Sequence, residues 1–262
     1  MQRPLFGKEF PGQLCNLLGK SPFVIFAGPC SIDQSFPVLA ADIASLVAGF
    51  RGGVFKARTS PYDFSGLGQE GLSLIEEAGK RYNRPIVVEV LSAQQLPFLE
   101  KVDILQIGAR IMYNYPLLKD VAETGKPILL KRHFSATIDE LLLAAEHILA
   151  AGNERVILCE RGIRTFETRY RSTLDLAAVI VLKQMTHLPV MVDPSHAAGD
   201  SSLVPGLVLA AAAAGADGAI IEVHQNPVQA CSDGPQAITP QILAHTLDKL
   251  EKILPILKPV QG

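Results

Sequence analysis

The chain has 262 residues, of which 48% are hydrophobic and 19% charged, with a formal net charge of −2. This length fits a single α/β barrel, which commonly needs about 250 residues. The near-neutral charge does not indicate a nucleic-acid or anionic-membrane partner, so any anion-binding site must come from local clustering of basic residues.

Short β-branched runs recur along the chain after an N-terminal extension over residues 1–20. Several are apolar almost throughout, as parallel strands covered by helices are. In chain order we predict eight strands over residues 23–27, 54–57, 86–90, 104–107, 128–131, 156–159, 190–192 and 219–223.

Helical patterns lie between these strands. In the one over 137–151, Thr137 and Glu140 form a capping box, which satisfies free amides of the first helical turn. Weaker helical stretches follow the third and fourth strands. The larger helices are predicted over 37–48, 69–82, 137–151, 172–185, 201–214 and 239–253.

Eight strand–helix repeats predict a single (β/α)8 TIM barrel over residues 21–262, with no separate regulatory domain. A doubly wound open sheet is the main structural alternative. Such a sheet normally carries a nucleotide loop such as GxGxxG after its first strand, whereas this chain has only AGPC at 27–30.

Cysteine usage favours a reducing compartment, because Cys15, Cys30, Cys159 and Cys231 are widely spaced and form no CxxC pair. The N-terminus has no apolar core of signal-peptide length. The longest apolar stretch, around 203–214, is shorter than the roughly 20 residues that a membrane span needs. We therefore expect a soluble cytoplasmic protein with no membrane contact, and a buried helix over that stretch.

Catalytic groups of α/β barrels lie at the carboxyl ends of the strands and in the loops that follow. Arg51 lies just before the predicted second strand, and five further basic residues lie at or after strand ends: Lys56, Arg58, Arg110, Lys131 and Arg161. Any one of them could be a solvated or ion-paired surface residue. Together they indicate a ligand with several negative charges, since arginine and lysine suit carboxylate and phosphate oxygens.

A second group comes from the ends of the first, seventh and eighth strands, which are neighbours in a closed barrel: Cys30, His196, Glu222 and Asp233. A thiolate, an imidazole and two carboxylates suit a divalent transition metal such as Mn, Fe, Co or Zn. Taken singly, Cys30 could be a small buried hydrophobe, His196 a helix cap and Asp233 an ordinary turn residue.

Seven segments in order resemble 3-deoxy-D-arabino-heptulosonate-7-phosphate (DAHP) synthases, specifically the compact type I-beta subgroup related to 3-deoxy-D-manno-octulosonate-8-phosphate synthases. The resemblance runs from about residue 21 to the early 240s. The segments are GPCS (28–31), KARTSPYDFSGLGQEGL (56–72), QIGAR (106–110), LLKR (129–132), ILCERGIRTFE (157–167), DPSHAAG (193–199) and EVHQNP with SDGPQ (222–236).

The segment KARTS at 56–60 favours the heptulosonate enzymes, which carry a Lys-Pro-Arg-Thr/Ser motif there. The octulosonate enzymes have a longer, Asn-containing loop instead. Four residues depart from the family pattern and leave aldose specificity open: Ala57, Ile111, Tyr113 and His133.

The resemblance implies a role for each candidate residue. Cys30, His196, Glu222 and Asp233 would bind the metal. Arg51, Lys56, Arg110, Lys131 and Arg161 would bind phosphoenolpyruvate, and Arg58, Thr59 and Ser60 the aldose phosphate. The catalytic residues would be Lys131, Arg161, Cys30 and His196, while His133 and His224 receive no role.

The expected activity is that of a transferase of the shikimate pathway, in aromatic amino-acid biosynthesis. It condenses phosphoenolpyruvate with erythrose 4-phosphate, needs one divalent metal ion, and works as a homotetramer in preference to a dimer. Three alternatives stay open. They are condensation with another aldose such as arabinose 5-phosphate, metal-free turnover, and a non-catalytic barrel that binds a phosphometabolite.

Overall fold

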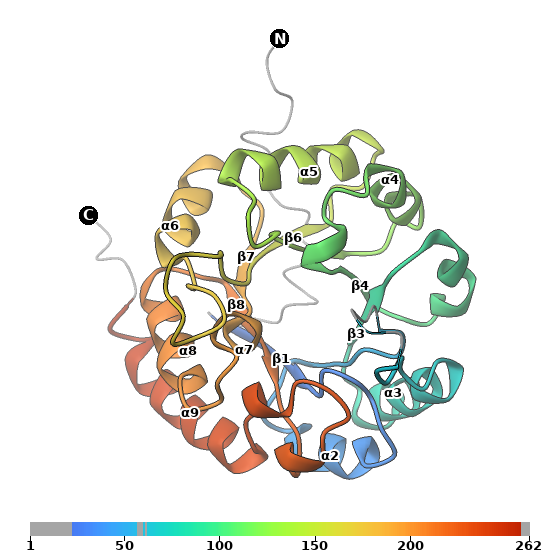
Figure 1. The fold of residues 1–262 in the computed structure, drawn as a ribbon, viewed down its shortest axis with the longest axis vertical. Coiled ribbons are helices and arrows are strands. Elements are labelled where there is room, and N and C mark those ends of the chain that lie inside the picture. Colours follow the sequence, from blue (N-terminus) through green and yellow to red (C-terminus); the bar gives the residue numbers. More distant parts are fainter. Residues whose placement is uncertain (1–22, 57–59, 61, 258–262) are drawn as a thin grey trace.

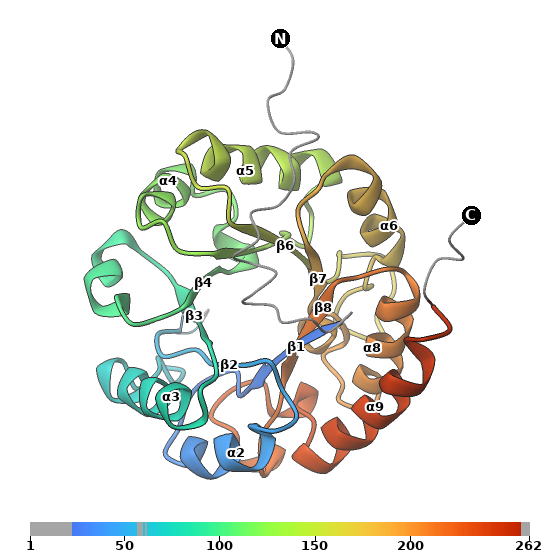
Figure 2. The ribbon, with the colours of Figure 1, turned by 180° about the vertical axis from the view of Figure 1, so that it is seen from behind.

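The computed structural model describes residues 23–56, 60 and 62–257. Its eight strands are parallel, follow chain order and close into a barrel, in which β8 pairs with β1. Helices surround the barrel on its outside (Figures 1 and 2). The predicted TIM barrel is therefore confirmed, whereas the extension predicted over 1–20 lies outside the described residues.

The strands are short, and all but the second lie close to where the sequence predicts them. They are β1 (Val24–Gly28), β2 (Gly49–Arg51), β3 (Ile86–Val90), β4 (Ile104–Ile107), β5 (Ile128–Lys131), β6 (Val156–Glu160), β7 (Val190–Val192) and β8 (Gly218–Glu222).

The predicted capping box is confirmed, because the Thr137 side chain accepts from the Glu140 amide at 3.2 Å while Glu140 accepts from the Thr137 amide at 2.7 Å. None of the described helices is long and apolar enough to cross a membrane. The α-helices are α2 (Phe36–Ile43), α3 (Gln69–Tyr82), α4 (Tyr115–Glu123), α5 (Ile138–Ala150), α6 (Leu176–Met185), α7 (Pro194–Ala198), α8 (Val204–Ala213) and α9 (Pro240–Ile253).

The second strand was predicted wrongly at 54–57. The pairing segment is Gly49–Arg51, and Gly49 fits because a Cβ there would lie 2.8 Å from the Phe26 ring. Val54 instead belongs to the loop after the strand, where its carbonyl accepts a hydrogen bond from the Gly68 amide at 2.8 Å. The apolar residues around Val54 therefore pack a folded loop, not a sheet.

Helix α6 begins later than the predicted residue 172. Thr173 forms an antiparallel bridge with Ile163, so the chain is still extended there. Asp175 then caps the helix by accepting from the Ala178 amide at 3.0 Å. The loop between β6 and α6 is consequently long, and it contributes Arg164, Arg171 and Ser172 to the cavity at the mouth of the barrel.

Side chains alternate along each strand between the barrel interior and the helix layer, as strand geometry requires. An inner apolar cluster fills the interior: Val24, Phe26, Val87, Ile104, Leu129, Ile157, Cys159, Met191 and Ile220. Two residues further along each strand, toward the carboxyl end, the inward position is polar in most strands. These polar positions include Arg51, Glu89, Gln106, Lys131, Arg161, Asp193 and Glu222.

Candidate active site

A cavity of about 540 Å³ opens at the carboxyl ends of the strands. It lies above the inner apolar cluster, so the barrel interior is apolar and its mouth is polar. Its lining includes Arg51, Lys56, Asp63, Glu89, Gln106, Arg110, Ile111, Lys131, Phe134, Arg161, Arg164, Arg171, Ser172, His196 and Asp233.

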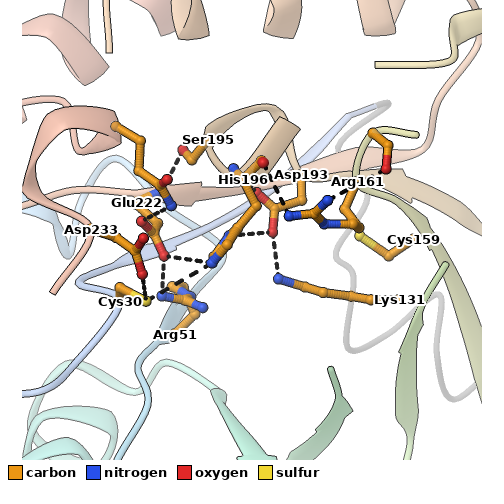
Figure 3. A network of polar contacts seen from close by, with 12 residues as sticks. Cys30, Arg51, Lys131, Cys159, Arg161, Asp193, Ser195, His196, Glu222 and Asp233 are labelled. Carbon is orange, nitrogen blue, oxygen red and sulfur yellow. Dashed lines mark hydrogen bonds and ion pairs between the residues drawn. The ribbon is translucent and has the colours of Figure 1, made fainter. Parts of the chain in front are cut away.

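The predicted metal-ligating residues come together at one side of this cavity (Figure 3). One ligand atom from each of Cys30, His196, Glu222 and Asp233 lies within 4.8 Å of the others. His196 Nε2 is 3.3 Å from Glu222 Oε1 and 3.9 Å from Cys30 Sγ. These donors can close on one ion with small side-chain shifts, and their mixed chemistry fits a divalent transition metal.

The imidazole of His196 is oriented by its other nitrogen. Nδ1 lies 2.8 Å from Asp193 Oδ2, which directs Nε2 toward the ligand group. Asp193 also accepts from the His196 amide at 2.9 Å as the cap of α7. A carboxylate behind a ligating histidine is the usual partner that fixes its tautomer. The arrangement therefore supports metal binding beyond the ligand atoms themselves.

Glu222 is likewise positioned by hydrogen bonds from neighbouring residues. Its Oε2 accepts from Gln236 Nε2 at 2.5 Å, and its amide donates to Ser195 Oγ at 2.9 Å. On its other oxygen, Arg51 NH1 donates at 3.3 Å. Glu222 is 1% exposed, so these partners compensate a carboxylate that has lost its hydration.

Cys30 is buried, and its surroundings disfavour the thiolate while the ion is absent. Burial, and next the charge of Glu222, raise the pKa of the thiol to about 12. The thiol donates to Asp233 Oδ2 at 2.9 Å, and Lys56 Nζ lies 2.9 Å from Sγ. Burial alone would raise the pKa of Asp233, but the Cys30 hydrogen bond and the charges of His196 and Arg171 lower it to about 2.

The basic residues of the cavity fall into two sets. In the first set, an acid lies beside each cation: Arg51 pairs with Glu222 at 3.3 Å, Lys56 with Glu89 at 3.9 Å, Arg171 with Asp233 at 3.3 Å, and Lys131 with Asp193. In the second set, Arg110, Arg161 and Arg164 make no ion pair with any described residue. Within the described part of the chain, Arg161 donates only to main-chain carbonyls, including that of His196 at 3.1 Å.

Two predicted phosphate ligands, Arg58 and Thr59, lie outside the described residues, as does Ala57. Ser60 is described, and its hydroxyl accepts from the Tyr62 amide at 3.3 Å; it is not part of the cavity lining. Lys56 lies on the loop after β2 and does not end a strand.

Several residues of the site were missed from the sequence: the cavity residues Glu89, Gln106, Phe134, Arg164 and Arg171, and Asp193 behind His196. Side chains two positions apart on a strand point to the same side. Glu89, Gln106 and Asp193 each lie two residues after an inward apolar residue and could have been found in this way. Arg164 and Arg171 lie on an irregular loop, where no periodicity indicates direction.

Of the residues that depart from the family pattern, Ile111 lines the cavity. Tyr113 and His133 pack against each other, with ring centroids 5.3 Å apart. His133 also lies 4.0 Å from the ring of Phe134. These three departures thus lie in the segments that follow β4 and β5.

The fold and this site define a (β/α)8-barrel enzyme. Its cavity is lined by arginine and lysine and adjoins four residues suited to bind a metal ion. A family model described as "DAHP synthetase I family" matches residues 16–257. The chain belongs to this family.

Individual proteins similar to this chain carry names of related enzymes. "Phospho-2-dehydro-3-deoxyheptonate aldolase" of Thermotoga maritima is 45% identical over 240 residues, covering 90% of this chain and 71% of the relative. A "2-dehydro-3-deoxyphosphooctonate aldolase" of Desulfosudis oleivorans is 30% identical over 265 residues, covering 93% and 92%.

Among solved structures, the Thermotoga maritima DAHP synthase matches with a TM-score of 0.87 and 44% identity, covering 90% of this chain and 70% of that one. A truncated form of 3-deoxy-D-arabino-heptulosonate 7-phosphate synthase from the same organism matches with a TM-score of 0.83 and 41% identity, covering 90% and 87%.

Proposed function

We propose that the protein is a transferase that condenses phosphoenolpyruvate with erythrose 4-phosphate to 3-deoxy-D-arabino-heptulosonate 7-phosphate and phosphate, the first step of the shikimate pathway. The observation that carries this proposal is the position of the Cys30–His196–Glu222–Asp233 group beside a cavity rich in arginine and lysine. The two features supply the electrophile activation and the anion binding that the reaction needs.

Phosphoenolpyruvate would be held by Arg51, Lys56, Arg110, Lys131 and Arg161. Its carboxylate and phosphate together carry about three negative charges, which buried cations can neutralise. Arg51 is 3% exposed, and its Nε atom has no hydrogen-bond partner among the described residues. Such an orphaned buried donor favours a ligand oxygen at this position.

The four-residue ligand group would hold one divalent ion, with Mn, Fe, Co and Zn all compatible with its donors. When bound, such an ion supplies Lewis acidity toward the carbonyl oxygen of the aldose. Asp193 would keep His196 in the ligating tautomer.

In the proposed reaction, C3 of phosphoenolpyruvate attacks the aldehyde carbon, forming the C–C bond while positive charge develops at C2. Water then adds at C2 and loses a proton, and the former aldehyde oxygen takes up a proton to become a hydroxyl. The resulting hemiketal phosphate collapses by C–O cleavage and releases inorganic phosphate. Lys131, which reaches the cavity from β5, is the candidate for proton transfer near C2 or C3. Arg161 would stabilise the departing phosphate.

Erythrose 4-phosphate is the favoured aldose because identity to the heptonate enzyme is 45%, against 30% for the octonate enzyme. Arg58, Thr59 and Ser60 would bind its phosphate. Arabinose 5-phosphate is the second candidate, since relatives with the octonate name match over nearly the whole chain.

We also propose one catalytic barrel over residues 21–262, preceded by the extension at 1–20, that assembles as a homotetramer in the cytoplasm. Light scattering coupled to size exclusion tests the assembly, and a mass near four times 28.2 kDa is expected. A monomer would contradict it.

The decisive assay follows phosphoenolpyruvate loss after chelator treatment, with erythrose 4-phosphate or arabinose 5-phosphate and with or without Mn²⁺. Consumption restored by the ion with erythrose 4-phosphate alone is the expected result. Consumption only with the pentose phosphate would move the activity to the octulosonate class. Absence of turnover with either aldose would leave a binding barrel. K131A and R161A should abolish turnover, and near-wild-type rates in either would refute their roles.

A further inference from the structure

Charge is distributed unevenly around the cavity. The cations near the ligand group already have acids beside them: Arg51 has Glu222 and Lys131 has Asp193. Arg171, at the rim, is paired with Asp233. A ligand anion that approaches these groups competes with carboxylates that are already in place.

The other side of the mouth, above β4 to β6, carries Arg110, Arg161 and Arg164. No described acid pairs with any of the three, although all three line the same cavity. Like charges gathered without a counter-charge oppose one another and are stabilised when an anion binds among them. This side is therefore the part of the cavity with unneutralised positive charge.

Arg164 is fixed in place although its side chain is exposed. Its guanidinium carbon lies 4.5 Å from the centre of the Phe134 ring, and its amide donates to the Phe134 carbonyl at 2.7 Å. A guanidinium that lies over an aromatic ring uses its face for the ring contact. Its N–H groups at the edge stay available to donate hydrogen bonds. The stack thus holds Arg164 ready for an oxyanion.

The electrostatics of neighbouring groups agree with this geometry. Burial lowers the pKa of His133, and the charges of Arg161 and Arg164 lower it further. The imidazole of His133 therefore lies in a region of positive potential to which Arg161 and Arg164 both contribute.

We infer that Arg164, carried on Phe134, is a third arginine of the subsite for the phosphate group of phosphoenolpyruvate, together with Arg110 and Arg161. The inference rests on the proposed function and assigns a role to a residue that the family resemblance leaves without one. The phosphate carries more charge than the carboxylate and is best matched by several arginine forks.

The test compares R164A with R169A. Arg169 lies on the same loop but does not line the cavity, so its removal controls for loop charge. We expect R164A to raise both the KM for phosphoenolpyruvate and the inhibition constant of inorganic phosphate about tenfold. The KM for erythrose 4-phosphate should change less than twofold. F134A should shift the same constants in the same direction by a smaller factor, and R164K should restore part of the affinity.

Calorimetry with phosphoenolpyruvate or inorganic phosphate alone, without any aldose, separates this inference from the reaction itself. Weaker binding in R164A but not in R169A supports it. Unchanged binding of both ligands in R164A, while the wild-type protein still consumes phosphoenolpyruvate with erythrose 4-phosphate, overturns the inference and leaves the proposed function intact. A rise confined to the KM of the aldose phosphate also overturns it, because Arg164 would then bind the other substrate.

Discussion

Lys131 donates a hydrogen bond to Asp193 across the mouth of the barrel, from the end of β5 to the residue that follows β7. The same carboxylate oxygen of Asp193 contacts Nδ1 of His196 at 2.8 Å. One buried side chain thereby joins the candidate proton-transfer lysine to a candidate metal ligand. Burial opposes ionisation of Asp193, but the charges of His196 and Lys131 hold its pKa well below the usual value.

D193N should weaken divalent-metal affinity about 10- to 100-fold, because an amide cannot fix His196 as a carboxylate does. The value of kcat at saturating metal should also fall, since Lys131 loses its ion pair. Chelator-competition titration and steady-state kinetics measure the two effects. D200N is the control, because Asp200 is exposed and bonds only within its own turn. Equal metal affinities in D193N and wild type would contradict the role of Asp193.

The thiol of Cys30 should react slowly with iodoacetamide in chelator-treated protein. A pKa of about 12 leaves a thiolate fraction of about 10⁻⁴ at pH 8. The rate should rise about tenfold per pH unit from 8 to 10 without a plateau. Peptide mass spectrometry follows it, with the exposed Cys231 as internal reference. A plateau below pH 10 would show that burial and Glu222 do not raise the pKa.

R132M should destabilise the fold by about 3–5 kcal/mol at pH 7.5, because it leaves the buried carboxylate of Glu160 without the Arg132 partner at 2.8 Å. Urea unfolding measures the loss. Burial already raises the pKa of Glu160, so the folded state binds a proton at the Glu160 carboxylate more tightly than the unfolded state does. Stability therefore falls as pH rises above the unfolded pKa, and falls further without Arg132.

The loss in R132M should accordingly be smaller at pH 5 than at pH 7.5. The double variant R132M/E160Q is the control, since it removes the charge together with its partner. It should be more stable than R132M at neutral pH. A loss that is independent of pH in R132M would mean that packing alone, and not the carboxylate, sets the cost.

G49A should destabilise the barrel by about 1–3 kcal/mol through overpacking. A Cβ at Gly49 would lie 2.5 Å from the Pro85 carbonyl oxygen and 2.8 Å from the Phe26 ring. G206A is the matched control in α8, where a Cβ meets nothing within 4 Å and should stabilise by about 0.5–1 kcal/mol. Urea unfolding compares the two. Equal effects would show that the strand position has room to relax.

The sequence predicts the barrel because its strands and helices alternate with clear periodicities. It fails at β2, because Gly49–Arg51 is too short and lacks β-branched residues, while the apolar loop around Val54 resembles a strand. The clustering of Cys30, His196, Glu222 and Asp233 could be predicted because they lie at or after the carboxyl ends of three neighbouring strands. Their spacing alone left a metal role open, and the family resemblance supplied it.

The pairing of each cation could not be predicted from sequence. Whether Arg51 is paired and Arg161 is not depends on side-chain positions that adjacent strands impose on one another. Arg164 could not be placed either, because its direction depends on the stack on Phe134 and not on any repeat.

Arg161 donates a hydrogen bond to the main-chain carbonyl of His196 in α7, so the two residues are in direct contact. A shift of His196 toward the proposed ion would move the carbonyl that accepts from Arg161, and a shift of Arg161 toward the proposed anion would act in the reverse direction. If both bind as proposed, the metal ion and phosphoenolpyruvate would therefore be linked ligands. By thermodynamic reciprocity, the factor by which the ion changes the affinity for the anion equals the factor by which the anion changes the affinity for the ion.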